Sequence, residues 1–546
     1  MNEILNLSIR NWLILISAVL VMTGIFYSVF KVKNYIYRSI IFVLIIGFCY
    51  YVFRIFPNIK IVGLVLFIIP LSFGGLIYLF GYEKPPNPIF DIAIRTDKGT
   101  KYVRNFLRGI SIFGSAGSGK TISLIFPILK HFSEQKFAGI IYDFKDGELT
   151  ELAIPLFKEK LKIIAIHNAS ISARVNPISP KLINDENDIN EIVAVLMDNL
   201  INNGAGKGDD FFKDSGSSLL SAVILKFWLD HPSFCTLPHV ISFILAVDFS
   251  VQEQNFNQSL GEQAINQFAK LKAFLTDNDR VAIQGSAFIL GLASERQTAS
   301  VLSTLANALR KISSPKTFWV LSGNEIDFDI NSDENRSVIS VLNEPKNSKF
   351  LSPINASIIH SISKQMMVRN RQPSFLCLDE APTIKLLNMA QIPATMRSFQ
   401  VGVIYCAQDI VQGIVQYGRD GFKEILANLS TQFFGKSNDP DTSKFYESYF
   451  ELVKEKTKSI SEKGDFLSGG RTITTGEKEV SKYRASRFQN LKVGEFAMLS
   501  DGKNQIYHIQ AEQITSEKIL EKKEISNSML NSNFTKIINE VKLLID

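Results

Sequence analysis

Three long apolar runs open this 546-residue chain, before any alternation of apolar and polar positions begins. Residues 11–30 and 61–82 carry no charge, and a middle run covers residues 39–53. A helix of about 20 residues spans the ~30 Å of membrane hydrocarbon, because a helix rises about 1.5 Å per residue. The pattern therefore predicts a membrane anchor over residues 1–84, with about three transmembrane helices at 11–30, 37–56 and 61–82.

The positive charges between these runs predict the orientation of the anchor. Lys31, Lys33 and Arg38 separate the first two runs, whereas Arg54 and Lys60 separate the last two. Three spans with the N-terminus outside would place the larger group inside, as the positive-inside tendency requires. The rest of the chain would then face the cytoplasm.

The apolar pattern changes after residue 85. Short continuous apolar runs alternate with helical segments, which is typical of a buried parallel sheet and predicts an α/β domain over residues 85–183 and 315–515. Residues 184–314 instead repeat apolar positions at helical spacing, as in "INEIVAVLMDNLI", and predict an all-α insert. A lysine- and asparagine-rich tail, residues 516–546, ends in a segment compatible with an amphipathic helix.

The apolar run "GISIF" leads into "GSAGSGKT", which fits the pattern GxxxxGK[ST]. Glycines let successive backbone N–H groups point at phosphates, Lys120 would reach the β- and γ-phosphates, and the Thr121 hydroxyl would hold Mg²⁺. The apolar helix that follows would present its positive end to the phosphates. We therefore predict that ATP and Mg²⁺ bind through Gly114, Ser115, Ala116, Gly117, Ser118, Gly119, Lys120 and Thr121.

A second apolar run, residues 375–378, ends in two acidic residues. Asp379 would hold Mg²⁺ through water, and Glu380 would act as general base toward the attacking water. The second carboxylate distinguishes an ATPase that hydrolyses from a protein that only holds nucleotide. Gln408 ends a further apolar run and could sense the γ-phosphate, with a simple solvated turn as the alternative.

Charge is distributed unevenly along the chain. The formal net charge is +6, which by itself identifies no nucleic-acid partner. Residues 184–314 hold nine Lys and Arg against fifteen Asp and Glu, a net of −6, so the remainder carries +12. An acidic insert is a poor clamp for a phosphate backbone, because binding gains affinity when Lys and Arg side chains neutralise phosphates and release their counterions. The insert suits a protein partner better, unless its charge serves only solubility.

The order of these motifs resembles the coupling-protein ATPases of type IV secretion and conjugation, the TraG/TraD/VirD-type family. "YDFKDGEL" resembles the family's D-P-K-G-E-L element, with Phe144 in place of proline and Asp146 inserted; "ARVNPIS", "GDDFFKDSGSSLLSAVI", "LDEAPTI" and "CAQD" are similar to four further elements. The resemblance covers roughly residues 85–515. It implies a RecA-like P-loop motor domain with an inserted all-α domain, anchored by helices in the bacterial inner membrane. The short loops between the apolar runs depart from the family, which commonly carries a periplasmic segment.

The resemblance also implies a ring, expected to be a homo-hexamer, with ATP between subunits. One subunit can then supply a transition-state arginine to the next. Arg397 resembles the residue with that role. Arg108, six residues ahead of Gly114, is a second candidate for it and is also expected among the nucleotide-binding residues. Either arginine could equally be a surface cation. Gln408 falls in the family's glutamine motif.

As a whole, the resemblance implies a coupling protein that captures a relaxase–single-stranded DNA complex and feeds it to a type IV secretion channel during conjugation. A variant that exports protein effectors would use the same chemistry. A membrane-bound docking scaffold that binds ATP without pumping is the alternative from another class, and Glu380 disfavours it. A translocase of duplex DNA is disfavoured by the helical insert.

Overall fold

The computed structural model describes residues 9–30, 41, 43–44, 54, 69–75, 86–201, 209–249, 270–462 and 471–545. Contacts divide the chain into two units, Met1–Pro86 and Asn87–Asp546. In the first unit, helix α2 (Ile9–Phe30) coincides with the first apolar run.

The predicted transmembrane helices are not supported. Within the ranges just given, the structure contains no helix with the length and apolar character to cross a bilayer. Most of the second and third predicted spans, 37–56 and 61–82, lies outside the described residues.

The second unit is built around a large sheet. Its strands are β3 (Ile110–Phe113), β4 (Ala138–Asp143), β5 (Leu161–Ala165), β6 (Val338–Leu342), β7 (Ser374–Leu378), β8 (Val401–Ala407), β9 (Thr431–Phe434), β12 (Glu495–Ser500) and β13 (Lys503–His508). They are ordered β13-β12-β9-β3-β8-β7-β4-β6-β5. Pairing is parallel from β9 to β5, and β12 and β13 add an antiparallel edge.

Helices cover both faces of this sheet, which explains why its central strands are mostly apolar. Side chains of β4 alternate between the two faces: Ile140 and Tyr142 join one buried cluster and Ile141 the other. The first face packs against α15 (Ser348–Met366) and the second against α5 (Phe126–Glu134). Further helices are α6 (Glu148–Phe157), α16 (Ile392–Arg397), α17 (Ile410–Tyr417), α18 (Arg419–Ala427), α19 (Pro440–Glu447) and α20 (Ala485–Gln489).

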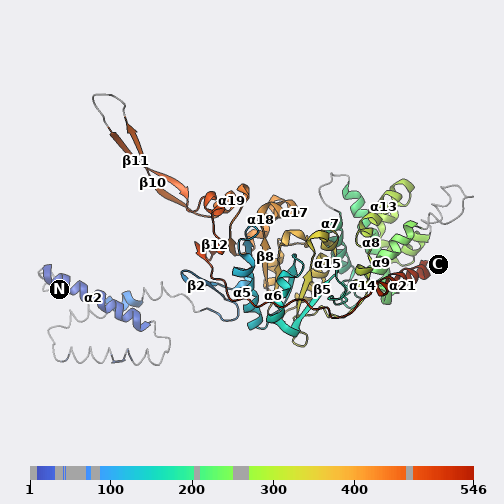
Figure 1. The fold of residues 1–546 in the computed structure, drawn as a ribbon, viewed down its shortest axis with the longest axis horizontal. Coiled ribbons are helices and arrows are strands. Elements are labelled where there is room, and N and C mark those ends of the chain that lie inside the picture. The colour runs from blue at the N-terminus through green and yellow to red at the C-terminus, as the bar shows by residue number, and fades with distance from the viewer. Residues whose placement is uncertain are drawn as a thin grey trace, which may run out of the picture. The chain divides into compact units, whose positions relative to one another are not determined.

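Between β5 and β6 the chain forms helices that gather at the β5 side of the sheet (Figure 1). They are α7 (Glu186–Leu200), α8 (Asp209–Asp230), α9 (Leu237–Phe249), α11 (Asp279–Gln284), α12 (Ser286–Gly291), α13 (Glu295–Arg310) and α14 (Pro315–Leu321). The Asp185 carboxylate caps α7 by accepting from two N–H groups of its first turn. The helical stretch continues through α14, past the predicted boundary at residue 314.

The C-terminal residues pack against these helices. Helix α21 (Asn527–Ile545) buries Leu530, Ile537 and Val541, and it lies beside α9 and α14. The Phe534 ring is 4.8 Å from that of Phe318 on α14. The amphipathic helix expected at the end of the tail is therefore present and docked.

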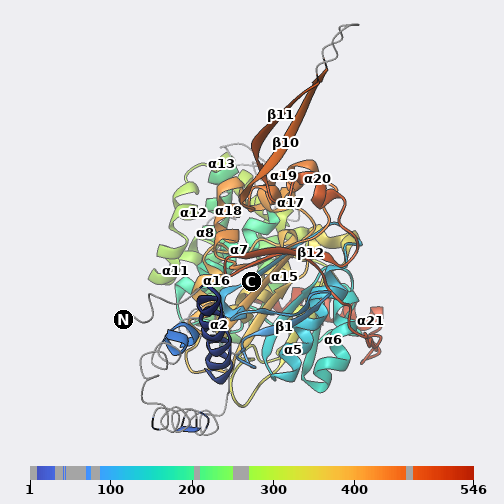
Figure 2. The ribbon, with the colours of Figure 1, turned by 90° about the vertical axis from the view of Figure 1, so that its left-hand side faces the viewer.

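Two hairpins complete the unit. The strands β1 (Ile92–Thr96) and β2 (Gly99–Val103) form one hairpin, and β10 (Leu452–Glu462) and β11 (Arg471–Ser481) form a longer one. The β10–β11 hairpin projects away from the sheet in both views (Figures 1 and 2).

Candidate nucleotide site at the carboxyl ends of the strands

The loop after β3 has the backbone that a phosphate-binding loop requires. Gly117 and Gly119 have φ angles of +75° and +93°, in the region that favours glycine. A Cβ at Gly119 would lie 3.1 Å from the backbone nitrogen of Gly494, so little room exists for a side chain. The chain then enters a π-helical turn, Thr121–Ile125, which continues into α5.

Lys120 is buried between this loop and the second acidic residue. Its ammonium donates to the carbonyl of Gly114 and lies 4.0 Å from Oε1 of Glu380. Burial lowers the pKa of Lys120, and the charges of Glu380 and Asp379 oppose this effect. The loop lysine therefore already faces the carboxylates where a terminal phosphate would lie.

Glu380 adopts a backbone conformation that is rare for a residue with a side chain. Its φ and ψ are +54° and +52°, and the residue is 1% exposed. Such a conformation costs of order 1 kcal/mol or more and persists where the surroundings enforce it. Here the Thr383 hydroxyl and N–H donate to the Glu380 carbonyl at 2.7 and 2.9 Å. A strained, buried glutamate indicates a functional position.

The two carboxylates are poorly solvated. Burial, and then the charge of Glu380, raise the pKa of Asp379 to about 7, against opposing effects of Lys145 and Lys120. Burial likewise raises the pKa of Glu380. Asp379 Oδ1 and both carboxylate oxygens of Glu380 have no hydrogen-bond partner among the described residues. Buried polar atoms without partners are costly, so this arrangement is suited to a ligand.

The same site fits a magnesium ion. Mg²⁺ prefers hard oxygen ligands and keeps several of its waters. The unpartnered oxygen of Asp379 and the hydroxyl of Thr121 are ligands of this kind. The Ser115 and Ser118 hydroxyls are also buried without a partner within the described part of the chain, and both could donate to phosphate.

Gln408 lies where the sequence predicted it, directly after β8. It is half-buried; burial raises the pKa of the Glu380 carboxyl, and Lys120 and then Gln408 oppose this effect. Because β8 lies between β3 and β7, Gln408 stands between the loop and the acidic pair. A role at the γ-phosphate stays a prediction.

Arg108 and Arg397 lie at the amino ends of the strands, opposite the carboxyl ends that carry the candidate site. Arg108 ends the short helix Phe106–Arg108 before β3, and Arg397 ends α16 before β8. β3 is four residues long, about 13 Å, so neither side chain reaches the loop of its own chain. Arg108 also pairs with Asp501 at 2.7 Å. Contact of either arginine with a nucleotide stays a prediction, and this placement is compatible with the expected role toward the nucleotide of a neighbouring subunit.

One contact of the loop had no signal in the sequence. The turn before β12 covers the phosphate-binding loop, and the N–H of Gly494 donates to the Ser118 carbonyl at 3.0 Å. Val493 lies beside this contact and is 66% exposed. The phosphate-binding loop and the turn before β12 are hundreds of residues apart in the sequence. They come together because the antiparallel strand β12 pairs with β9, the neighbour of β3.

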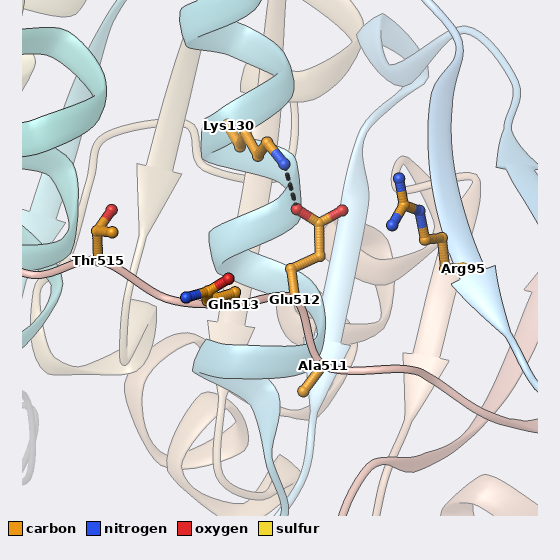
Figure 3. A pocket seen from close by; sticks show the side chains of 6 residues that line it. All are labelled: Arg95, Lys130, Ala511, Glu512, Gln513 and Thr515. Atoms are coloured by element: carbon orange, nitrogen blue, oxygen red, sulfur yellow. Dashed lines mark hydrogen bonds and ion pairs between the residues drawn. The ribbon is translucent and has the colours of Figure 1, made fainter.

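A separate surface cavity of about 510 Å³ lies between β1, α5 and the segment after β13 (Figure 3). The Lys130 ammonium pairs there with Glu512 at 2.5 Å, and Arg95 stands on the opposite wall. No predicted site residue lines this cavity, so it is distinct from the candidate nucleotide site.

Together, the glycine loop, the buried lysine and the acidic pair form a candidate nucleotide site with the features of the P-loop class. The family model described as "Type IV secretory system Conjugative DNA transfer" matches residues 81–482, and the chain belongs to this family. The resemblance drawn from the sequence motifs is therefore confirmed.

Solved structures confirm the predicted α/β fold. The plasmid coupling protein TrwB with the ATP analogue ADPNP is 13% identical, with a TM-score of 0.59 over 82% of this chain and 94% of that one. TrwB with ADP and Mg²⁺ is 12% identical, with a TM-score of 0.56 over 82% and 93%. At such identities the likeness shows the fold alone. No curated protein sequence matches the chain significantly.

Proposed function

We propose that this protein is an ATP-hydrolysing coupling protein that drives a relaxase–single-stranded DNA complex toward a type IV secretion channel. Membership of the conjugative DNA-transfer family supports the transfer role. The proposal that the protein hydrolyses ATP rests on the features of Glu380. It is a buried carboxylate in a strained backbone conformation, without a hydrogen-bond partner among the described residues and 4.0 Å from the loop lysine.

In the proposed reaction, water attacks the γ-phosphate in line with the leaving oxygen. The loop N–H groups and Lys120 would hold the β- and γ-phosphates, while Thr121 and Asp379 would hold Mg²⁺, which would neutralise phosphate charge. Glu380 accepts the proton of the attacking water, and its raised pKa brings it closer to the value that suits a base near neutral pH. Gln408 lies beside Glu380 and would orient the water or the terminal phosphate.

A ring of subunits completes the proposed site. Arg397 and Arg108 lie at the amino ends of the strands, and the phosphate-binding loop lies at their carboxyl ends. Head-to-tail assembly would bring the arginines of one subunit to the nucleotide of the next. Six subunits are expected from the family resemblance.

The charge of the insert supports a proposal about the cargo. Its net charge of −6 disfavours a direct clamp on DNA and favours a basic protein surface. We therefore propose that the insert recognises the protein part of the cargo, a relaxase or an exported effector. The effector-exporting ATPase is the second candidate function, and the same observation supports it.

Attachment to the membrane is proposed from the apolar residues before residue 84. The measurement is fractionation of cells followed by an alkaline carbonate wash. Retention in the pellet would support a membrane anchor, and full recovery in the soluble fraction would refute attachment.

Translocation is tested on a single-stranded oligonucleotide that carries biotin and streptavidin at one end. The full-length protein with ATP should displace streptavidin, whereas Lys120→Ala and ADPNP should not support displacement. ATP hydrolysis with no displacement at either end of the DNA would favour the effector-exporting ATPase. ATP binding with no hydrolysis would favour the docking scaffold.

A further inference from the structure

The loop "DFKDG" after β4 is a motif that the proposed hydrolysis does not use. Asp143 lies fully buried at its base and accepts hydrogen bonds at 2.7 Å from both the N–H and the hydroxyl of Thr150. The other oxygen of Asp143 accepts the N–H of Lys145 at 3.1 Å. The buried aspartate therefore fixes the backbone of the lysine two residues further on.

The turn that follows is fixed as well. Asp146 has a φ of +54°, and its N–H donates to the carbonyl of Asn343 at 3.0 Å. Gly147 has a φ of +103°, and a Cβ there would lie 2.7 Å from the Ile519 side chain. α6 begins directly afterwards. The loop thus holds Lys145 at a defined position at the carboxyl end of β4.

This position is next to the acidic pair. β4 and β7 are parallel neighbours, and the N–H of Asp379 donates to the Tyr142 carbonyl at 3.0 Å. The half-buried Lys145 interacts electrostatically with Asp379 and Glu380, and its ammonium lies 3.6 Å from Glu148. The positive charge of Lys145 also contributes to lowering the pKa of Lys120, after the larger effect of burial. Two lysines from different loops therefore interact electrostatically with one pair of carboxylates.

We infer that Lys145 is a second phosphate-binding lysine, which contacts the terminal phosphate of a bound nucleoside triphosphate. The inference rests on the proposed nucleotide site. In the sheet order β3-β8-β7-β4, the phosphate-binding loop and Lys145 flank the acidic strand from opposite sides. A phosphate chain that begins at the loop and ends at Asp379 and Glu380 brings only its last phosphate toward Lys145. A diphosphate would leave Lys145 with its ion-pair partner, Glu148.

The binding affinities of a triphosphate analogue and of ADP distinguish contact with the terminal phosphate from a general contribution of Lys145 to nucleotide binding. ADPNP and ADP, each with Mg²⁺, are titrated into the full-length protein and into Lys145→Met, Lys145→Arg and Lys162→Met. Lys162 is an exposed lysine of the edge strand β5 and serves as the matched control. Lys145→Met should weaken ADPNP binding about 10- to 100-fold, the size of a lost charged hydrogen bond, and change ADP binding by less than about threefold. Arginine should restore part of the affinity.

Equal losses for ADPNP and ADP would overturn the inference, because Lys145 would then shape the site without contacting the last phosphate. Unchanged affinities would overturn it directly. Failure of the unmodified protein to bind either nucleotide would instead refute the proposed function, and the inference would fall with it. Thermal unfolding of each variant shows whether a loss of affinity reflects a loss of fold.

Discussion

Replacing Asp379 with asparagine should stabilise the nucleotide-free fold above neutral pH while it removes a magnesium ligand. Asp379 is 4% exposed, and burial with the charge of Glu380 raises its pKa from 3.8 to about 7. A carboxyl whose pKa is higher in the folded state favours folding when protonated. Its ionisation therefore lowers the free energy of unfolding as the pH rises from about 4 to about 7. Asparagine is neutral throughout this range.

The magnitude follows from the two pKa values. Their difference corresponds to about 4 kcal/mol at alkaline pH, where the carboxyl is ionised in both states. At pH 5 the cost is about 2 kcal/mol, because the unfolded carboxyl is ionised and the folded one is not. The advantage of the variant over the parent should therefore grow by about 2 to 3 kcal/mol between pH 5 and pH 8. The free-energy cost of burying the asparagine amide is the same at pH 5 and pH 8, because the amide does not titrate. It therefore cancels when the stability differences at the two pH values are compared.

The assay is thermal unfolding at both pH values, without Mg²⁺ or nucleotide. A unit that runs from Asn87 to Asp546 has an unfolding entropy of roughly 1 kcal/mol per kelvin, so the gap in Tm should widen by about 2 to 3 °C. Glu521→Gln, at an exposed carboxylate, provides the control and should show no widening. A gap that is the same at both pH values would refute the claim that Asp379 is held ionised at a cost to stability.

Three further outcomes are expected. Ile537→Ala should lower the free energy of unfolding by about 2 to 4 kcal/mol in a denaturant titration, because it opens a cavity under α21; Leu543→Ala, at a side chain 79% exposed, should have almost no effect. Gly139→Ala should cost about 1 to 3 kcal/mol in the same titration, because a Cβ there would lie 2.5 Å from a phenylalanine ring of β7. Arg397→Ala should abolish ATP hydrolysis, and mixing it with Lys120→Ala should restore part of the activity, since a mixed interface joins an intact loop to an intact arginine; no recovery would contradict a shared site.

The strands and the nucleotide loop were predictable because local pattern determines them. β4, β7 and β8 are buried over their whole lengths, so each appears in the sequence as an unbroken apolar run. Lys120 and Glu380 each follow such a run, and the carboxyl ends of parallel strands share one edge of a sheet. Sequence reasoning could therefore place both residues in one site.

Other features depend on contacts between distant segments. Lys145 became a site residue only because the sheet places β4 beside β7, an order that local pattern does not encode. The amphipathic pattern of α21 was visible in the sequence, but its packing against α9 and α14 depends on contacts with distant segments. Conversely, long apolar runs near the N-terminus predicted three membrane spans that the described residues do not support.

The rate of ATP hydrolysis by the full-length protein, with and without single-stranded DNA, tests the central claim most directly. The account predicts hydrolysis that DNA stimulates and that both Lys120→Ala and Glu380→Gln abolish, with nucleotide binding retained in Glu380→Gln. Nucleotide binding without hydrolysis under every DNA condition, or hydrolysis that survives Glu380→Gln, would contradict it.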